Sequence, residues 1–125
     1  MDTQDFITKL NEAQDLMTKE KYSKAFILLE KLKELDKNSD FDYNLTHRLY
    51  QLYSNCNSLY NQKTILKIIN SISNIFSSIT FRELNQRLKN EINISLEEEI
   101  LKREIELLIL RGLLSCKIEK NKIIF

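Results

Sequence analysis

The chain has 125 residues and a formal net charge of +1, with 42% hydrophobic and 30% charged residues. This composition indicates one folded domain, or two small units sharing a core, and excludes a disordered chain. Residues 1–60 carry 8 Lys and Arg against 10 Asp and Glu, and residues 61–125 carry 11 against 8. Neither half has the dense positive charge typical of a nucleic-acid binder.

Four segments within residues 1–77 repeat apolar residues at helical spacing. The polar turns "KEKY", "DKNSD" and "SNCNS" separate them. We therefore expect four helices with apolar stripes over residues 6–17, 25–35, 41–56 and 59–76. The segment "EKYSKAFILLEKLKELDK" matches half of a TPR-type helical repeat, but an ordinary amphipathic helix has the same pattern.

A different pattern begins after residue 77. "SSIT" is a short β-prone segment, and Thr80 with Glu83 forms the spacing of a capping box before a short helix. Ser95 and Glu98 have the same spacing before a longer helix, whose apolar residues run from Ile100 to Ile109. We expect both pairs to cap the helices that follow them.

Gly112 is the only glycine in the chain, which has no proline. It follows the long helix and suits the left-handed residue that ends a helix, because it lacks a Cβ. The apolar runs "LLSCKIE" and "KIIF", separated by "KN", predict a β-hairpin. The expected fold is mainly α, with a short TPR-like helical-repeat bundle over residues 1–77 and a winged helix with a C-terminal β-hairpin over residues 78–125.

Winged helices bind DNA or proteins. The second helix carries five carboxylates against Lys102 and Arg103, which disfavours contact with a polyanion. Nucleic-acid binding stays open as the alternative through a modest patch of scattered basic residues: Arg82, Arg87, Lys89, Lys117, Lys120 and Lys122.

The stretch "ITFRELNQRL", followed by "EEEILKREIELLILRGLLSCKIEKNKIIF", resembles the winged-helix half of a PCI domain. That module occurs in scaffold subunits of the proteasome lid, the signalosome and translation initiation factor 3, and the nearest likeness is to lid subunits. The resemblance implies a non-catalytic scaffold subunit of a large complex, such as the lid of the proteasome regulatory particle. Its partners would be other PCI or lid-type subunits.

The hairpin is the expected contact surface, because a terminal hairpin can leave a strand edge unpaired. The predicted partner-binding residues are Lys117, Ile118, Glu119, Lys120, Lys122, Ile123 and Phe125. A helical adaptor with a purely structural hairpin is a further alternative.

We expect no enzyme activity and no cofactor. His47 is the only histidine and has no carboxylate three or four positions away, Cys56 has no identifiable base, and one glycine leaves no glycine-rich phosphate loop. A stacking surface for RNA bases could be formed by four tyrosines, Tyr43, Tyr50, Tyr53 and Tyr60. Their spacing instead favours packing between helices.

The longest apolar runs are too short to span a bilayer, and the polar start "MDTQDF" does not resemble a signal peptide. Cys56 and Cys116 lack CxxC and metal-ligand spacing, so we predict two buried free thiols rather than a disulfide. We expect a cytoplasmic or nuclear protein without membrane contact.

Overall fold

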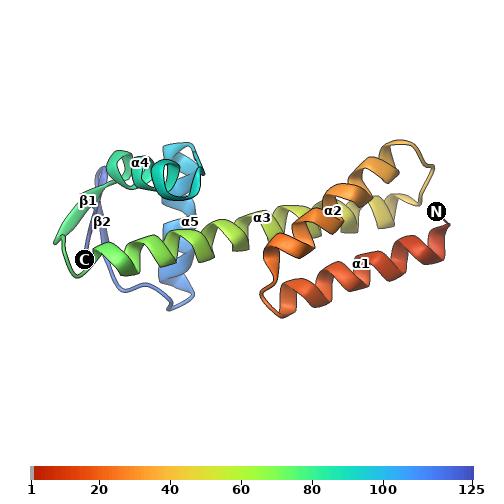
Figure 1. The fold of residues 1–125 in the computed structure, drawn as a ribbon, viewed down its shortest axis with the longest axis horizontal. Coiled ribbons are helices and arrows are strands. Elements are labelled where there is room, and N and C mark those ends of the chain that lie inside the picture. The colour runs from red at the N-terminus through yellow and green to blue at the C-terminus, as the bar shows by residue number, and fades with distance from the viewer. Residues whose placement is uncertain (1) are drawn as a thin grey trace. The chain divides into compact units, whose positions relative to one another are not determined.

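The computed structural model describes residues 2–125 and is mainly helical, as predicted (Figure 1). The elements of the described chain are α1 (Thr3–Thr18), α2 (Tyr22–Lys37), α3 (Tyr43–Ile72), β1 (Ser78–Thr80), α4 (Phe81–Ile92), α5 (Glu98–Leu110), β2 (Lys117–Glu119) and β3 (Lys122–Ile124). They form two compact units, one up to Tyr60 and one from Asn61 onward.

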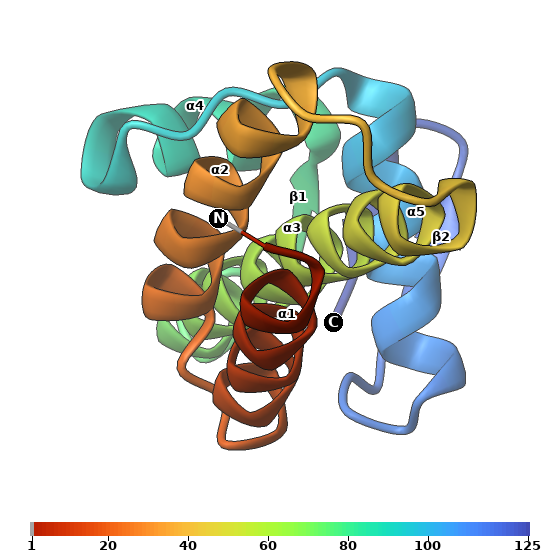
Figure 2. The same cartoon turned by 90° about the vertical axis from the view of Figure 1, so that its right-hand side faces the viewer.

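The N-terminal unit contains α1, α2 and the first part of α3. Asp2 caps α1, because its carboxylate accepts a hydrogen bond from the Asp5 N–H at 2.8 Å. The helices α1 and α2 lie side by side as a helical hairpin (Figure 2). Their apolar stripes meet α3 in a core of Phe6, Leu10, Ala13, Tyr22, Ala25, Leu29, Leu32, Leu49 and Cys56.

The predicted break at "SNCNS" is wrong, because α3 is one helix of 30 residues. Each serine or asparagine lowers helix propensity by less than about 1 kcal/mol relative to alanine, and the segment contains no glycine or proline. Cys56, in the middle of this segment, is fully buried in the N-terminal core. Packing of this helix face therefore outweighs the weak local preference for a turn.

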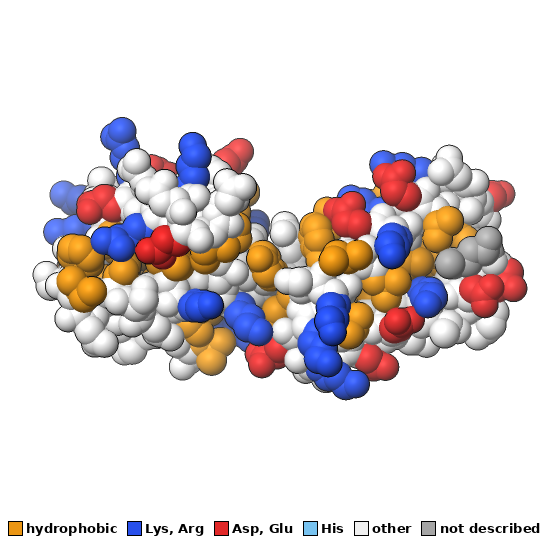
Figure 3. Space-filling model, in the orientation of Figure 1, with side chains coloured by type: hydrophobic (Ala, Val, Ile, Leu, Met, Phe, Trp, Pro, Cys, Tyr) orange, Lys and Arg blue, Asp and Glu red, His pale blue; other side chains and the backbone are white. Residues whose placement is uncertain are grey.

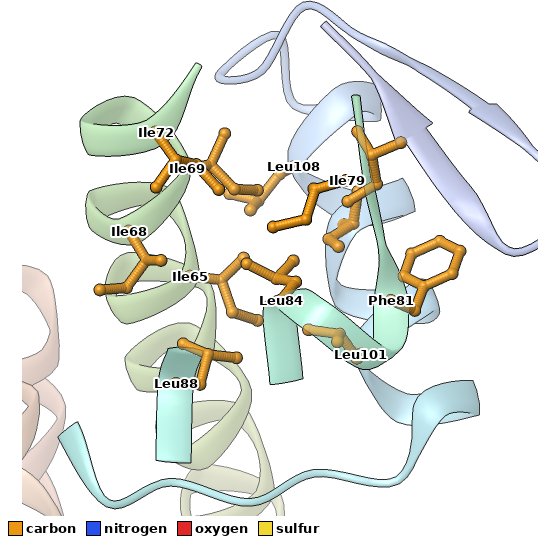
Figure 4. Packing of buried hydrophobic residues seen from close by; sticks show 12 residues of the cluster. Ile65, Ile68, Ile69, Ile72, Ile79, Phe81, Leu84, Leu88, Leu101 and Leu108 are labelled. Carbon is orange, nitrogen blue, oxygen red and sulfur yellow. The ribbon is translucent and has the colours of Figure 1, made fainter. Parts of the chain in front are cut away.

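The C-terminal unit begins at Asn61, within α3. Isoleucines of α3 pack against α4, α5 and the strands (Figure 4). The buried residues of this core are Ile65, Ile68, Ile69, Ile72, Ile79, Phe81, Leu84, Leu88, Leu101, Ile105, Leu108 and Ile123. The end of α3 is thus part of the same core as the segment that follows it.

The three strands form one antiparallel sheet in the order β1-β3-β2. The predicted hairpin is present as β2 and β3, joined by Lys120 and Asn121. Ile123 of β3 lies opposite Ile79 of β1 on one side and Ile118 of β2 on the other. The last strand of the chain is therefore the central strand of the sheet.

Thr80 caps α4 as predicted, and Glu83 contacts the Thr80 hydroxyl rather than the Thr80 N–H that a full capping box would use. The Thr80 hydroxyl oxygen accepts a hydrogen bond from the Glu83 N–H at 3.1 Å, and the hydroxyl donates to the Glu83 carboxylate at 2.9 Å. This pairing satisfies one backbone donor that the first turn of a helix leaves without an intrahelical partner.

The second predicted capping box, Ser95 with Glu98, is wrong. The helix α5 begins only at Glu98, with Glu97 at the N-cap position and no side-chain cap. The side-chain amide of Asn85 hydrogen bonds to both the C=O and the N–H of Leu96, and the N–H contact measures 3.2 Å. These bonds hold the preceding loop against α4, which delays the start of the helix.

Gly112 ends α5 as predicted, with a φ of +73°. The Gly112 N–H donates to the Ile109 C=O, and the Leu113 N–H donates to the Leu108 C=O, both at 3.0 Å. This pair of bonds is the Schellman motif, which needs a residue in the left-handed conformation. The chain then turns toward β2.

Candidate interaction surface

The outer edge of β2 is the candidate interaction surface, because β3 is covered on both sides. Hydrogen bonds from the Phe81 N–H to the Asn121 C=O and from the Phe125 N–H to the Ser77 C=O, both 3.0 Å, bracket the β1–β3 ladder. In an antiparallel ladder, backbone groups of successive residues point to opposite sides. Ile123 therefore faces β1, while Lys122 and Ile124 face β2.

The register assigns the backbone groups of β2 in the same way. Lys122 lies opposite Glu119 and Ile124 lies opposite Lys117, so the backbone groups of these two β2 residues point toward β3. The N–H and C=O of Ile118, between them, point to the outside of the sheet. This outer side of β2 pairs with no other strand among the described residues.

Three of the predicted partner-binding residues form this edge strand. Lys117 and Glu119 are exposed, whereas Ile118 is half-buried and packs against the C-terminal core. Neither charged side chain forms an ion pair within residues 2–125. The strand thus presents two charges on its outer face and one partly covered apolar residue toward the core.

The other four predicted residues have different environments. Lys120 lies in the hairpin turn with a φ of +55°, and Lys122 is exposed on the central strand. Phe125 is half-buried against the core, with its N–H bonded to Ser77. Ile123 has no exposed surface, so its side chain is not available to a partner.

The charge on α5 differs from the sequence-based expectation, because Glu104 does not face solvent. Its side chain is 0% exposed, and the Gln62 side-chain amide donates to its carboxylate at 3.3 Å. Arg103 reaches the same carboxylate at 3.3 Å, and Arg111 donates to the side-chain oxygen of Gln62. Sequence reasoning missed this buried polar cluster.

A signal for the burial of Glu104 exists in the sequence. The residue lies three positions after Leu101, next to Ile105 and four positions before Leu108, on the apolar stripe of α5. Its burial reduces the exposed negative charge on the helix. Glu98, Glu99 and Glu106 remain exposed, so α5 is still a poor surface for a polyanion.

Basic side chains of the C-terminal unit are interspersed with acidic ones on the face drawn in Figure 3. Arg82 and Lys89 are exposed on α4, while Arg87 lies over the Phe76 ring, 5.1 Å from its centroid. The lysines at positions 117, 120 and 122 are exposed on the hairpin. The six basic residues considered above are thus distributed over α4 and the hairpin.

The tyrosines of α3 divide into two classes. Tyr53 and Tyr60 pack against the N-terminal core as predicted, whereas Tyr43 is 79% and Tyr50 41% exposed. The Tyr53 hydroxyl donates to the Glu30 carboxylate at 2.5 Å, and this hydrogen bond, together with burial and the negative charge, raises the pKa of Tyr53 to about 12. The Lys33 ammonium lies 3.8 Å from the centroid of the Tyr53 ring.

The remaining candidate residues are dispersed. Cys56 is buried and its thiol donates to the Tyr22 C=O at 3.4 Å, while Cys116 is half-buried, and both are free. Burial raises the pKa of both thiols. His47 is exposed, and its ring stacks on Tyr43 with 6.0 Å between the ring centroids.

Within residues 2–125, no helix has the length and apolar character needed to cross a membrane. Nor does any group of three His, Cys, Asp or Glu side chains in this range converge as a metal site would require. Comparison of the chain with protein-family models, curated proteins and solved structures finds no match.

Proposed function

We propose that the chain is a non-catalytic protein–protein interaction scaffold of the PCI type, whose C-terminal winged helix docks partners through the hairpin. The observation that carries the proposal is the unpaired outer edge of β2. One face of its sheet packs on the helices of the C-terminal core. Strand addition to such an edge supplies backbone hydrogen bonds to a partner strand. The expected partners are other PCI or lid-type subunits in the cytoplasm or nucleus.

The order of elements supports a winged helix. The end of α3, then β1, α4, α5 and the β2–β3 hairpin follow one another in the arrangement expected for that fold, with β1 paired to β3. The PCI resemblance described above covers this same segment. The helical hairpin of α1 and α2 supports a short TPR-like arm in front of it.

The alternative function is nucleic-acid binding through the wing. The exposed Lys117, Lys120 and Lys122 on the hairpin favour it, because basic residues on a wing can contact phosphates. Glu119 lies among these lysines and the exposed side of α5 carries three glutamates, which oppose such contacts. Protein docking therefore fits the charge distribution better.

A tagged pull-down from the native source, read by mass spectrometry at moderate and high salt, tests the proposal. The chain offers a matched pair of edge variants, Ile118→Pro and Ile118→Ala. Both shorten the same half-buried side chain, but only proline removes the N–H that points out of the sheet. Circular dichroism of both variants checks that the fold is retained.

The scaffold proposal predicts recovery of lid, signalosome or initiation-factor subunits, with loss of these partners in Ile118→Pro and retention in Ile118→Ala. Equal recovery with both variants indicates a helical adaptor whose hairpin is structural. Recovery of nucleic acid that washes away with salt, without such subunits, overturns the scaffold proposal and favours the wing as a phosphate-binding surface.

A further inference from the structure

The outer edge of β2 is complementary to a second β2 strand. We propose that a second copy of this chain pairs antiparallel with β2 along its outer edge, with Ile118 opposite Ile118 of the second copy. The inference rests on the proposed function and deepens it by naming a partner for the same edge. It would join two three-stranded sheets into one six-stranded sheet with twofold symmetry.

Backbone geometry defines this pairing. Only Ile118 within β2 directs both its N–H and its C=O outward, so two copies facing each other at this residue exchange two backbone hydrogen bonds. The flanking positions then form the closer, non-hydrogen-bonded pairs of the ladder. Side chains at such positions interact most strongly across the strands.

The side chains of β2 are self-complementary in this register. Lys117 lies opposite Glu119 of the second copy, and Glu119 lies opposite Lys117 of the second copy. Two opposite-charge pairs thus form by symmetry from a single "KIE" sequence. Both side chains are exposed and without an ion pair in the described part of the chain, so no existing contact has to break.

On the opposite face of the sheet, Ile118 of each copy forms an apolar pair. Its side chain is half-buried at the margin of the C-terminal core, next to the fully buried Ile123. An isoleucine from the second copy in the adjacent strand position would cover its remaining exposed surface. Charged pairs on one face and an apolar pair on the other are the pattern of a continued sheet.

The opposite edge of the sheet is less suited to self-pairing. The residues of β1 with outward backbone groups are Ser78 and Thr80, and Thr80 is the N-cap of α4. The chain leaves the strand into a helix at Phe81, which limits the length of any added ladder. Self-pairing through β2 is therefore the favoured closed arrangement.

Charge reversal tests the pairing on the purified chain. Lys117→Glu creates two Glu–Glu contacts in the symmetric dimer, and Glu119→Lys creates two Lys–Lys contacts. We expect either variant to weaken the wild-type self-association by about tenfold or more, since two favourable pairs become two repulsive pairs. Sedimentation equilibrium over a range of protein concentrations measures the dissociation constant.

Two combinations of these substitutions restore opposite charges across the strands and act as matched controls. The double swap Lys117→Glu/Glu119→Lys has opposite charges at both contacts again, and we expect it to recover the dimer. An equimolar mixture of the two single variants should form a heterodimer, because all four facing charges are then paired. Circular dichroism confirms that each variant is folded, as expected for substitutions at exposed positions.

The outcomes separate this inference from the proposed function. A wild-type protein that stays monomeric at concentrations on the order of 1 mM overturns self-pairing, as does a dimer that single charge reversals leave unchanged. In either case, recovery of other subunits through the hairpin in the pull-down would still support the scaffold. Self-association lost in the single variants and restored in the double swap and the mixture establishes the β2 pairing.

Discussion

The side-chain amide of Gln62 donates a hydrogen bond to the carboxylate of Glu104 at 3.3 Å, which joins α3 to α5 within the C-terminal unit. Arg111 in turn donates to the oxygen of the same Gln62 amide. Gln62 is 4% and Glu104 0% exposed, so the two polar groups meet away from solvent. Polar groups buried in this way need their partners, because each lost hydrogen bond leaves a desolvated group behind.

Replacing Glu104 should therefore destabilise the protein. For Glu104→Ala we expect the free energy of unfolding to fall by about 2–4 kcal/mol, through loss of the buried acceptor and its volume. Glu106→Ala, two positions along on the exposed side of the helix, should change it by less than about 0.5 kcal/mol. Urea unfolding followed by circular dichroism measures both, and equal effects would contradict the role of the buried carboxylate.

Alanine substitutions at Thr80 and Ser95 should affect stability differently. Thr80→Ala removes the side chain that accepts the Glu83 N–H and should lower the free energy of unfolding by about 1 kcal/mol. Ser95→Ala should have little effect, because Ser95 lies outside α5 and does not cap it. Thermal unfolding of the two variants side by side tests this difference. A larger loss for Ser95→Ala would show that α5 begins earlier than Glu98.

Gly112 has space for a side chain, but its backbone conformation is unfavourable for other residues. A Cβ at this position would meet no atom within 4 Å, while the φ of +73° is unfavourable for residues other than glycine. Gly112→Ala should therefore cost about 1 kcal/mol of stability, and Gly112→Asn less, because asparagine adopts this conformation more readily. Chemical unfolding of both variants checks the order, and a loss well above this value would indicate a steric clash instead.

The Tyr53–Glu30 hydrogen bond should make stability depend on alkaline pH. The pKa of Tyr53 is raised from its ordinary 10.0 to about 12, so the folded protein holds this proton more tightly than the unfolded chain. The resulting stabilisation is fully present below about pH 10 and is lost as the pH rises through about 12.

Titration of tyrosinate absorbance measures this effect directly. Tyr53→Phe should remove the absorbance change near pH 12, and Glu30→Gln should move it to lower pH by removing the charged acceptor. Glu34→Gln, an exposed carboxylate on the same helix, serves as a control that should leave it in place. An unaltered titration in Glu30→Gln would show that the hydrogen bond does not control this proton.

Local pattern was sufficient for three features of the C-terminal half. The Thr80–Glu83 cap, the end of α5 at Gly112 and the two-residue turn of the hairpin all depend on neighbouring residues, so the sequence predicted them. The apolar stripes of α1 and α2 were readable for the same reason, because helical spacing alone defines a buried face.

The sequence-based predictions were wrong where packing decides between similar local preferences. The segment "SNCNS" has only a weak preference for a turn, and the burial of Cys56 keeps it helical. Ser95 has only the spacing of a helix cap, and the contacts of Asn85 with Leu96 hold its loop outside α5. The burial of Glu104 also requires Gln62 from a distant part of the chain.

Sequence by itself determined that the chain is mainly helical and ends in a hairpin with the pattern "KIE" in its first strand. Only the tertiary structure decided which edge of that hairpin is open. The pairing of β1 with β3 covers one side of the last strand and leaves Ile118 with its backbone groups pointing outward. Strand order depends on contacts between residues far apart in sequence, which local periodicity does not contain.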